Sequence, residues 1–161
     1  MTDRPETARE FLESCRAARL EHRRCEWRIA QLDAQARSIT TSLRDTPGGG
    51  GGGDPHHDGL LVALADQRVR LEELAREAAS RQLDVERFIE RLSDAAHRVI
   101  LQLRYCDLLS WGEVQEAMKG FGLFYGDRQM FRLHDQAMTA AEALWGEDHG
   151  ESVLPENEPE H

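Results

Sequence analysis

Aromatic residues are scarce in this sequence: they make up 6% of the 161 residues, although 40% of the residues are hydrophobic. Alanine and leucine supply most of the apolar side chains, a composition that suits helices with narrow apolar stripes better than a thick globular core. Apolar runs of membrane-spanning length and a signal-peptide pattern at the start are also missing. We therefore expect a cytoplasmic protein with no membrane contact.

Cysteine is limited to three residues, an odd number that argues against a disulfide framework. Cys15 and Cys25 fall in one predicted helix, about 15 Å apart along its axis. They are too far apart to bridge each other and are interpreted as small apolar fillers. The sequence also gives no sign of a glycine-rich phosphate loop, of a nucleophile with a base or of paired carboxylates in a pocket. We expect no catalytic residues, no enzyme activity and no cofactor.

One short stretch offers metal ligands, since His56, His57 and Asp58 follow a glycine-rich segment. Adjacent histidines in such a loop lack the neighbouring groups that fix the orientation of metal ligands. We therefore interpret the stretch as part of a solvated loop and predict no metal site.

A sustained heptad pattern runs through the first part of the sequence. Apolar residues recur there at alternating spacings of four and three, with no Gly or Pro between them, which is typical of a coiled-coil helix. The positions are Phe11, Cys15, Ala18, His22, Cys25, Ile29, Leu32, Ala36, Ile39 and Leu43, of which His22 is the one polar residue.

Six successive glycines then predict a flexible connector over residues 46–58. A second long helix with a leucine-rich stripe, widened by Leu61, is expected from about Gly59 to Arg91. Two long helices joined by one loop predict an antiparallel helical hairpin over residues 7–91. Neither helix has enough apolar surface to be stable alone, so we expect a homo-oligomer that forms through the hairpin.

Three shorter helices are predicted over residues 93–145. The first ends near Tyr105, and the second opens at Ser110 with the capping-box sequence SWGE. The third is amphipathic and begins at Gly126 or Asp127. Two helices in tandem, of which the second is longer and amphipathic, are typical of a helix-turn-helix.

The last residues, 146–161, have no basic residue except histidine, six acids and two prolines. This composition predicts a disordered acidic tail. The predicted fold class is therefore all-α, with a long antiparallel hairpin, or coiled coil, followed by a small helix-turn-helix module of three helices.

The start of the last predicted helix carries side chains suited to reading DNA. In a helix-turn-helix, the outward residues at the start of the second helix meet base edges, where Arg suits guanine and Gln suits adenine. The outward positions here are Asp127, Arg128, Gln129, Phe131, Arg132, Asp135 and Gln136. Arg and Gln are also common on helix faces that contact only water, so periodicity leaves both interpretations open.

Two segments carry a family likeness: LRYCDLLSWGEVQEAM and, after it, DRQMFRLHDQAM. They resemble the C-terminal module of a family of small phage and prophage proteins. That family is related to the fourth region of bacterial sigma factors and to phage late-gene transcription regulators of the ArpU and RinA type. Its members also have two N-terminal helices joined by a Gly/Ser/Pro-rich loop, so the likeness covers most of residues 10–145.

The resemblance implies a sigma-like helix-turn-helix that regulates transcription by binding double-stranded DNA, with RNA polymerase as a further partner. By position, it places base contacts at Asp127, Arg128 and Arg132, with Gln129 and Phe131 nearer the DNA backbone.

The sequence departs from the family in two ways. The segment KGFGLFYG makes the turn several residues longer, and it could change the helix angle, fold as an apolar plug or form a partner surface. The net charge is −10, and Asp127 and Asp135 flank the arginines, which disfavours phosphate contact. The competing hypothesis is a coiled-coil interaction or structural protein, or a packaging protein like a terminase small subunit, without regulatory DNA readout.

Overall fold

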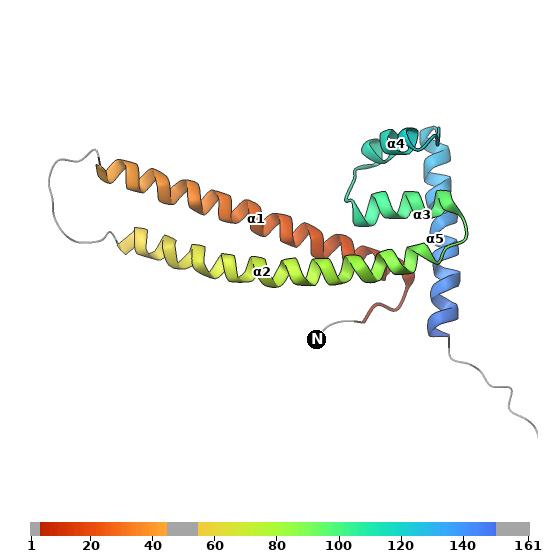
Figure 1. Ribbon diagram of the computed structural model, residues 1–161, viewed down its shortest axis with the longest axis horizontal. Helices are drawn as coiled ribbons and strands as arrows, with labels where there is room; N and C mark the ends of the chain where they lie inside the picture. The colour runs from red at the N-terminus through yellow and green to blue at the C-terminus, as the bar shows by residue number, and fades with distance from the viewer. Residues whose placement is uncertain (1–3, 45–54, 151–161) are drawn as a thin grey trace, which may run out of the picture. The chain divides into compact units, whose positions relative to one another are not determined.

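The computed structural model describes residues 4–44 and 55–150. They form α1 (Ala8–Arg44), α2 (Pro55–Glu90), α3 (Ala95–Leu101), a π-helical turn (Gln102–Cys106), α4 (Trp111–Gly120) and α5 (Asp127–His149) (Figure 1). No strand occurs in this described part of the chain, so the predicted all-α class is confirmed. Within the same ranges, none of the helices is both long enough and apolar enough to cross a membrane.

The chain divides into two compact units. The hairpin unit is Cys15–Asp84, formed by most of α1 and α2. The terminal unit joins Val85–His161 to Met1–Ser14, as far as these are described, and so contains α3 to α5 with the two ends of the long helices. The unit boundary therefore crosses both long helices, whereas the sequence predicted a boundary after residue 91.

In the hairpin unit, α1 and α2 pack along the predicted seam. Arg68 Nη2 lies 3.3 Å from Asp33 Oδ1, and Arg19 donates a hydrogen bond to Gln82. Residue numbers therefore fall on α2 as they rise on α1, and the two helices are antiparallel. The apolar cluster at their distal end comprises Leu32, Leu60 and Leu64 with Ile29, Ala36, Ile39 and Ala63 packed against it.

The start of α2 differs from the prediction. The helix begins at Pro55, so residues 55–58 are helical and do not belong to the connector predicted over residues 46–58. Proline is favoured in the first turn because its missing N–H has no helical partner there, and Asp58 adds a favourable charge at the helix start. Leu61, predicted to widen the buried stripe, is exposed. Residues 45–54 of the connector lie outside the described residues.

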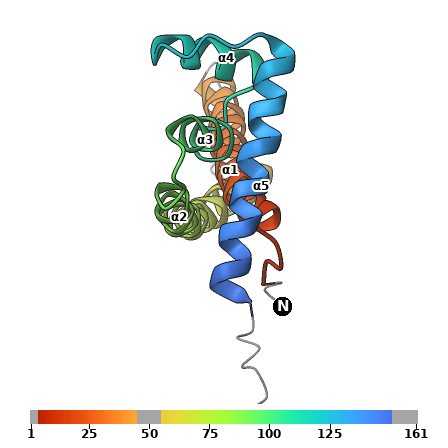
Figure 2. The ribbon, with the colours of Figure 1, turned by 90° about the vertical axis from the view of Figure 1, so that its right-hand side faces the viewer.

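The terminal unit is built around α5, which Figure 2 shows running from α4 past α3 toward the first turns of α1. Three aromatic rings join the ends of the three long helices. The ring centroids of Phe11 and Trp145 are 5.1 Å apart, and those of Phe88 and Trp145 are 5.9 Å apart. This cluster accounts for the position of the unit boundary, because it holds the start of α1 and the end of α2 against α5.

The start of α1 is capped from the far end of the chain. The carboxylate of Glu142 on α5 accepts hydrogen bonds from the backbone N–H of Ala8 at 3.1 Å and of Arg9 at 2.9 Å. The indole N–H of Trp145 donates to the carbonyl of Glu6 at 3.0 Å. A carboxylate at a helix N-terminus satisfies unpaired N–H groups and complements the helix dipole.

The end of α5 also differs from the prediction. The helix continues to His149, so residues 146–149 are helical, although the sequence predicted a disordered tail from residue 146. Arg91 pairs with Asp148 through an Nη2–Oδ1 contact of 2.8 Å, and this hydrogen bond lowers the pKa of Asp148. The His149 ring stacks on Trp145 with centroids 3.9 Å apart. Residues 151–161 of the predicted tail lie outside the described residues.

Candidate nucleic-acid interface

The first element of the candidate interface is α4, whose start the sequence predicted correctly. Ser110 Oγ accepts from the Glu113 N–H at 3.3 Å, and the Glu113 carboxylate accepts from the Ser110 N–H at 2.7 Å. This reciprocal capping box fixes where the helix begins. Val114 and Met118 are buried on its inner face.

The turn from Phe121 to Gly126 leads from α4 to α5 with a defined path. Gly122 has a φ of 78°, and the N–H of Leu123 donates to the Met118 carbonyl at 2.9 Å. Together these features form a Schellman motif, in which glycine supplies the left-handed residue. Farther along, the Gln115 side-chain amide donates to the Tyr125 carbonyl at 2.9 Å. The turn is therefore tied to α4 at both of its ends.

The two phenylalanines of this turn are exposed, whereas Tyr125 is half-buried. Phe121 is 65% exposed and Phe124 is 76% exposed, so the turn does not fold as an apolar plug. Exposed clusters of large apolar side chains are typical of interaction surfaces.

At the start of α5, exposure follows the predicted helical period. The buried residues are Met130, Leu133, His134, Ala137, Met138, Ala141 and Trp145. The predicted outward positions Asp127, Arg128, Gln129, Phe131, Arg132, Asp135 and Gln136 are all exposed. The side chains proposed from the sequence thus share the outer surface of one helix.

Two of these side chains have structural roles that the sequence did not predict. Gln129 Oε1 accepts from the N–H of Gly126 at 3.2 Å, which caps the start of α5. The Phe131 ring packs edge-on against Trp111 with centroids 5.1 Å apart, although 44% of the residue stays exposed. Both therefore help to position the helix as well as lying on its outer surface.

Arg128 and Arg132 differ from them, because within the described residues neither guanidinium takes part in an ion pair. They are four residues apart and therefore lie on one side of the helix. The surface at the start of α5 therefore presents two exposed guanidinium groups that could bind an anionic or hydrogen-bond-accepting partner. Asp127 and Asp135 are exposed beside them.

A buried polar cluster holds the opposite side of α5 in place. The Tyr105 hydroxyl and His134 Nε2 form a hydrogen bond of 3.0 Å. The Trp111 ring meets the His134 ring edge-on at 5.0 Å, and the Arg104 guanidinium lies 4.4 Å from the centre of the Trp111 ring. The residues that carry the family resemblance, LRY, the Trp that opens α4 and RLH, thus contact one another. Their observed role is to join three elements of the terminal unit.

The π-helical turn was not predicted, because the sequence indicated an ordinary helix to Tyr105. The Asp107 N–H donates to the Gln102 carbonyl at 3.0 Å, a π-helical spacing. Leu108 follows with a φ of 60°, a backbone conformation that costs an L-residue about 1–2 kcal/mol. Its side chain is buried, and the strained connection brings Trp111 over α5. Non-glycine residues in this conformation cluster at functional sites.

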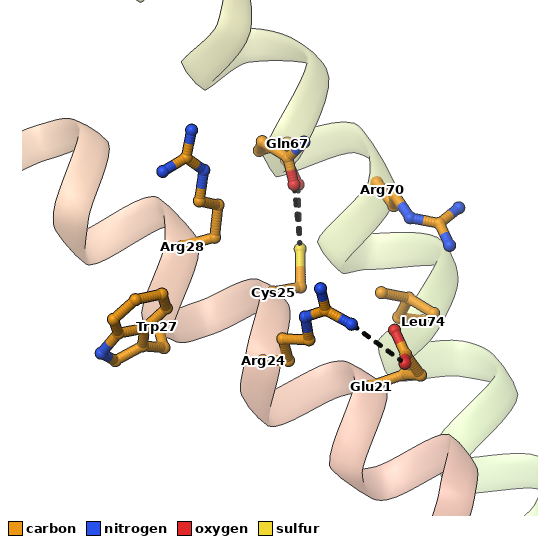
Figure 3. Close-up of a pocket in the computed structure, with 8 residues that line it drawn as sticks. All are labelled: Glu21, Arg24, Cys25, Trp27, Arg28, Gln67, Arg70 and Leu74. Carbon is orange, nitrogen blue, oxygen red and sulfur yellow. Dashed lines mark hydrogen bonds and ion pairs between the residues drawn. The ribbon is translucent and has the colours of Figure 1, made fainter.

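The hairpin unit has a groove lined by residues of both α1 and α2. Figure 3 shows that its arginines do not converge: Arg28 and Arg70 point away from each other, and Arg24 turns toward Glu21, 3.9 Å away. On the floor of the groove, the Cys25 thiol hydrogen-bonds to Gln67, 3.5 Å from its carbonyl oxygen. Cys25 and Gln67 thus form a polar layer in the seam between the two helices. The arginines that line the groove are not arranged to bind an anion together.

His56, His57 and Asp58, the stretch for which the sequence predicted no metal site, lie in the first turn of α2. In the described part of the chain, no group of three or more His, Cys, Asp or Glu side chains is placed to hold a metal ion.

The chain matches a known protein family over the segment that carries this surface. The family described as "Protein of unknown function (DUF1492)" matches residues 44–138, which is more than half of the 161-residue chain. The matched range contains α2, α3, α4 and the start of α5, and so includes all the outward residues from Asp127 to Gln136. No curated protein and no solved structure matches the chain.

Proposed function

The chain belongs to the DUF1492 family of proteins of unknown function, and we propose that it binds duplex DNA with the exposed start of α5, as a phage-type regulator of transcription. The observation that carries the proposal is that Arg128 and Arg132 are exposed on one side of that helix and make no ion pair with any other described residue. The major groove of DNA is about 12 Å wide and admits an α-helix.

Each outward residue has a role that its chemistry suggests. Arg128 and Arg132 can each donate two hydrogen bonds to one guanine, and Asp127 can accept from the amino group of cytosine. Gln129 and Phe131 are partly committed to capping and to Trp111, so we assign them to the DNA backbone and to thymine methyl contact. Gln136 lies about two helical turns beyond Gln129 on α5. We assign it to adenine or to a phosphate.

The rigidity of the surrounding structure supports this assignment. The capping box of α4, the Schellman turn and the Tyr105–His134 hydrogen bond fix the start of α5 from three sides. Because the backbone of the helix is already fixed, entry into a groove has to order only its side chains.

The acidic character of the chain limits the expected affinity. With a net charge of −10 and two aspartates beside the arginines, one copy gains little from nonspecific phosphate attraction. Specific binding would then need a second copy or a contact with RNA polymerase.

Selection of bound sequences from a random duplex pool, run with the full chain at two salt concentrations, tests the proposal. We expect enrichment of a short motif that contains guanine and persists at the higher salt concentration. If the bound sequences show no enriched motif at either salt concentration, sequence-specific binding of DNA is contradicted.

A second candidate function is that of an interaction module without DNA readout, including the packaging role of a terminase-like small subunit. The exposed Phe121 and Phe124 favour it. Replacing both with serine would then abolish capture of a polymerase or packaging component from phage-infected cells. Under our leading proposal, the same variant keeps its DNA affinity.

A further inference from the structure

The second helix, α2, carries another row of heptad-spaced apolar residues on its solvent side. Val62 is 62% exposed, Val69 is 60% exposed and Leu83 is 48% exposed. These residues and Arg76 stand seven apart along the helix. Ala65, Glu72 and Ala79 lie between them at spacings of three and four. We call these seven positions the outer stripe; the 3–4 alternation is that of a coiled-coil seam.

The outer stripe faces mainly away from α1, and only Ala65 and Ala79 at its edge line grooves shared with that helix. The residues of α2 that pack toward α1 include Leu64, Leu74 and Ala78, all buried. At 3.6 residues per turn, the centre of the outer stripe lies about 160° around the helix from that buried seam. Among residues 4–44 and 55–150, the hairpin therefore leaves a second apolar face of α2 exposed.

The solvent side of α1 has a shorter apolar stripe, in which the exposed Ala30 and Ala34 follow Trp27. Leu20 and Trp27 are exposed and seven residues apart. The positions between and beside them, Arg24 and Gln31, are polar and exposed. A coiled-coil seam needs apolar residues in both of its rows, so α2 is the helix equipped to pair with another helix.

We propose that a second copy of this chain docks on the outer stripe, with the two α2 helices antiparallel about a two-fold axis. In one register, Glu72 of each copy faces Arg76 of the other. The same register stacks Val69 on Ala79 and Leu83 on Ala65 of the second copy, each contact occurring twice by symmetry. Residues 65–83 would then form a seam about 27 Å long.

Charge complementarity selects this arrangement. A parallel, in-register pair would place Arg76 against Arg76 and Glu72 against Glu72, and like charges in contact are destabilising. The antiparallel register replaces both repulsions with two ion pairs. Within the described residues, neither Glu72 nor Arg76 makes an ion pair in its own chain, so both are available.

Size complementarity points to the same register. Each of the large exposed residues Val69 and Leu83 meets an exposed alanine, Ala79 or Ala65. Alternation of large and small side chains lets two helices approach closely and interdigitate. This pairing does not depend on DNA binding, although it would supply the second copy that the acidic chain needs for specific affinity.

Sedimentation equilibrium of the full chain with charge-reversal variants tests the pairing. We expect a dimer for the unmodified chain, and dissociation constants at least tenfold higher for Glu72→Arg and for Arg76→Glu. The double variant Glu72→Arg/Arg76→Glu restores opposite charges across the axis and should restore the dimer. Glu77→Arg, the same reversal on another face of α2, should dimerise like the unmodified chain.

A monomeric unmodified chain, or a double variant no tighter than the single ones, would overturn the proposal, provided circular dichroism shows folded helices. Oxidative cross-linking reports the orientation independently. The variant Val69→Cys/Ala79→Cys should form a covalent dimer, whereas Val69→Cys alone should not. Efficient cross-linking by the single variant would show a parallel pair and contradict the register.

Discussion

The Tyr105 hydroxyl lies 3.0 Å from Nε2 of His134, and both side chains are buried. This pair links the π-helical turn to the inner side of α5, directly behind the surface that carries Arg128 and Arg132. Removing the hydroxyl leaves a buried ring nitrogen without its partner, which costs about 1–3 kcal/mol. We therefore expect Tyr105→Phe to lower the free energy of unfolding by this amount in urea titrations. Tyr125→Phe, a half-buried control in the turn, should stay within about 0.5 kcal/mol.

The same histidine predicts how stability depends on pH. Burial, followed by the charge of Arg9, lowers the pKa of His134; Arg104 acts in the same direction and Asp135 opposes it. The folded state therefore holds the ring neutral, while the unfolded state binds a proton below about pH 6.5. Stability is then fully present above this pH and falls as the pH decreases toward the lowered pKa.

Urea midpoints at pH 7.5 and pH 5 measure this effect. The decrease between the two should be smaller in His134→Gln than in the unmodified chain, because glutamine does not titrate. An equal decrease of the urea midpoint in both proteins would show that groups other than His134 cause the pH dependence of stability.

The aromatic cluster that closes the terminal unit should contribute strongly to stability. Trp145 contacts Phe11 and Phe88 and donates to the Glu6 carbonyl. Trp145→Ala should lower the free energy of unfolding by about 3–5 kcal/mol. Trp27→Ala removes the same side chain from an exposed position and should change it by about 0.5 kcal/mol or less. Similar losses in the two variants would show that the cluster is not formed.

Gly120 at the end of α4 and Gly122 in the turn that follows provide a matched pair. Gly122 has a φ of 78°, whereas Gly120 is helical, and both have open space where a Cβ would lie. Gly122→Ala should therefore destabilise by about 1–2 kcal/mol through backbone strain alone. Gly120→Ala should stabilise by about 0.5–1 kcal/mol because alanine loses less entropy in a helix. Thermal unfolding should therefore show a lower midpoint temperature for Gly122→Ala and a higher one for Gly120→Ala. Midpoints that shift in the same direction would argue against the Schellman turn.

Features set by neighbouring residues were predictable from the sequence. The capping box of Ser110 and Glu113 and the 3–4 spacing that brings Leu32 to the hairpin seam both depend on separations of a few residues. Exposure of the outward positions of α5 followed from helical periodicity in the same way.

Features that depend on distant residues were not predictable. The Glu142 carboxylate caps Ala8 from 134 residues away, and Asp148 extends α5 through its ion pair with Arg91. Neither contact leaves a local pattern. The engagement of Phe131 with Trp111 likewise depends on the path of the turn and on the left-handed Leu108, which hydrophobic periodicity does not report.

The central claim is that the guanidinium groups of Arg128 and Arg132 enter the major groove. Fluorescence anisotropy with a duplex chosen by selection compares Arg128→Ala/Arg132→Ala with the control Arg70→Ala/Arg87→Ala, which removes the same charge from exposed positions of α2. We predict at least a tenfold loss of affinity in the first variant and less than a threefold change in the control, with both variants fully folded. Equal affinity of the two variants for the duplex would contradict the account.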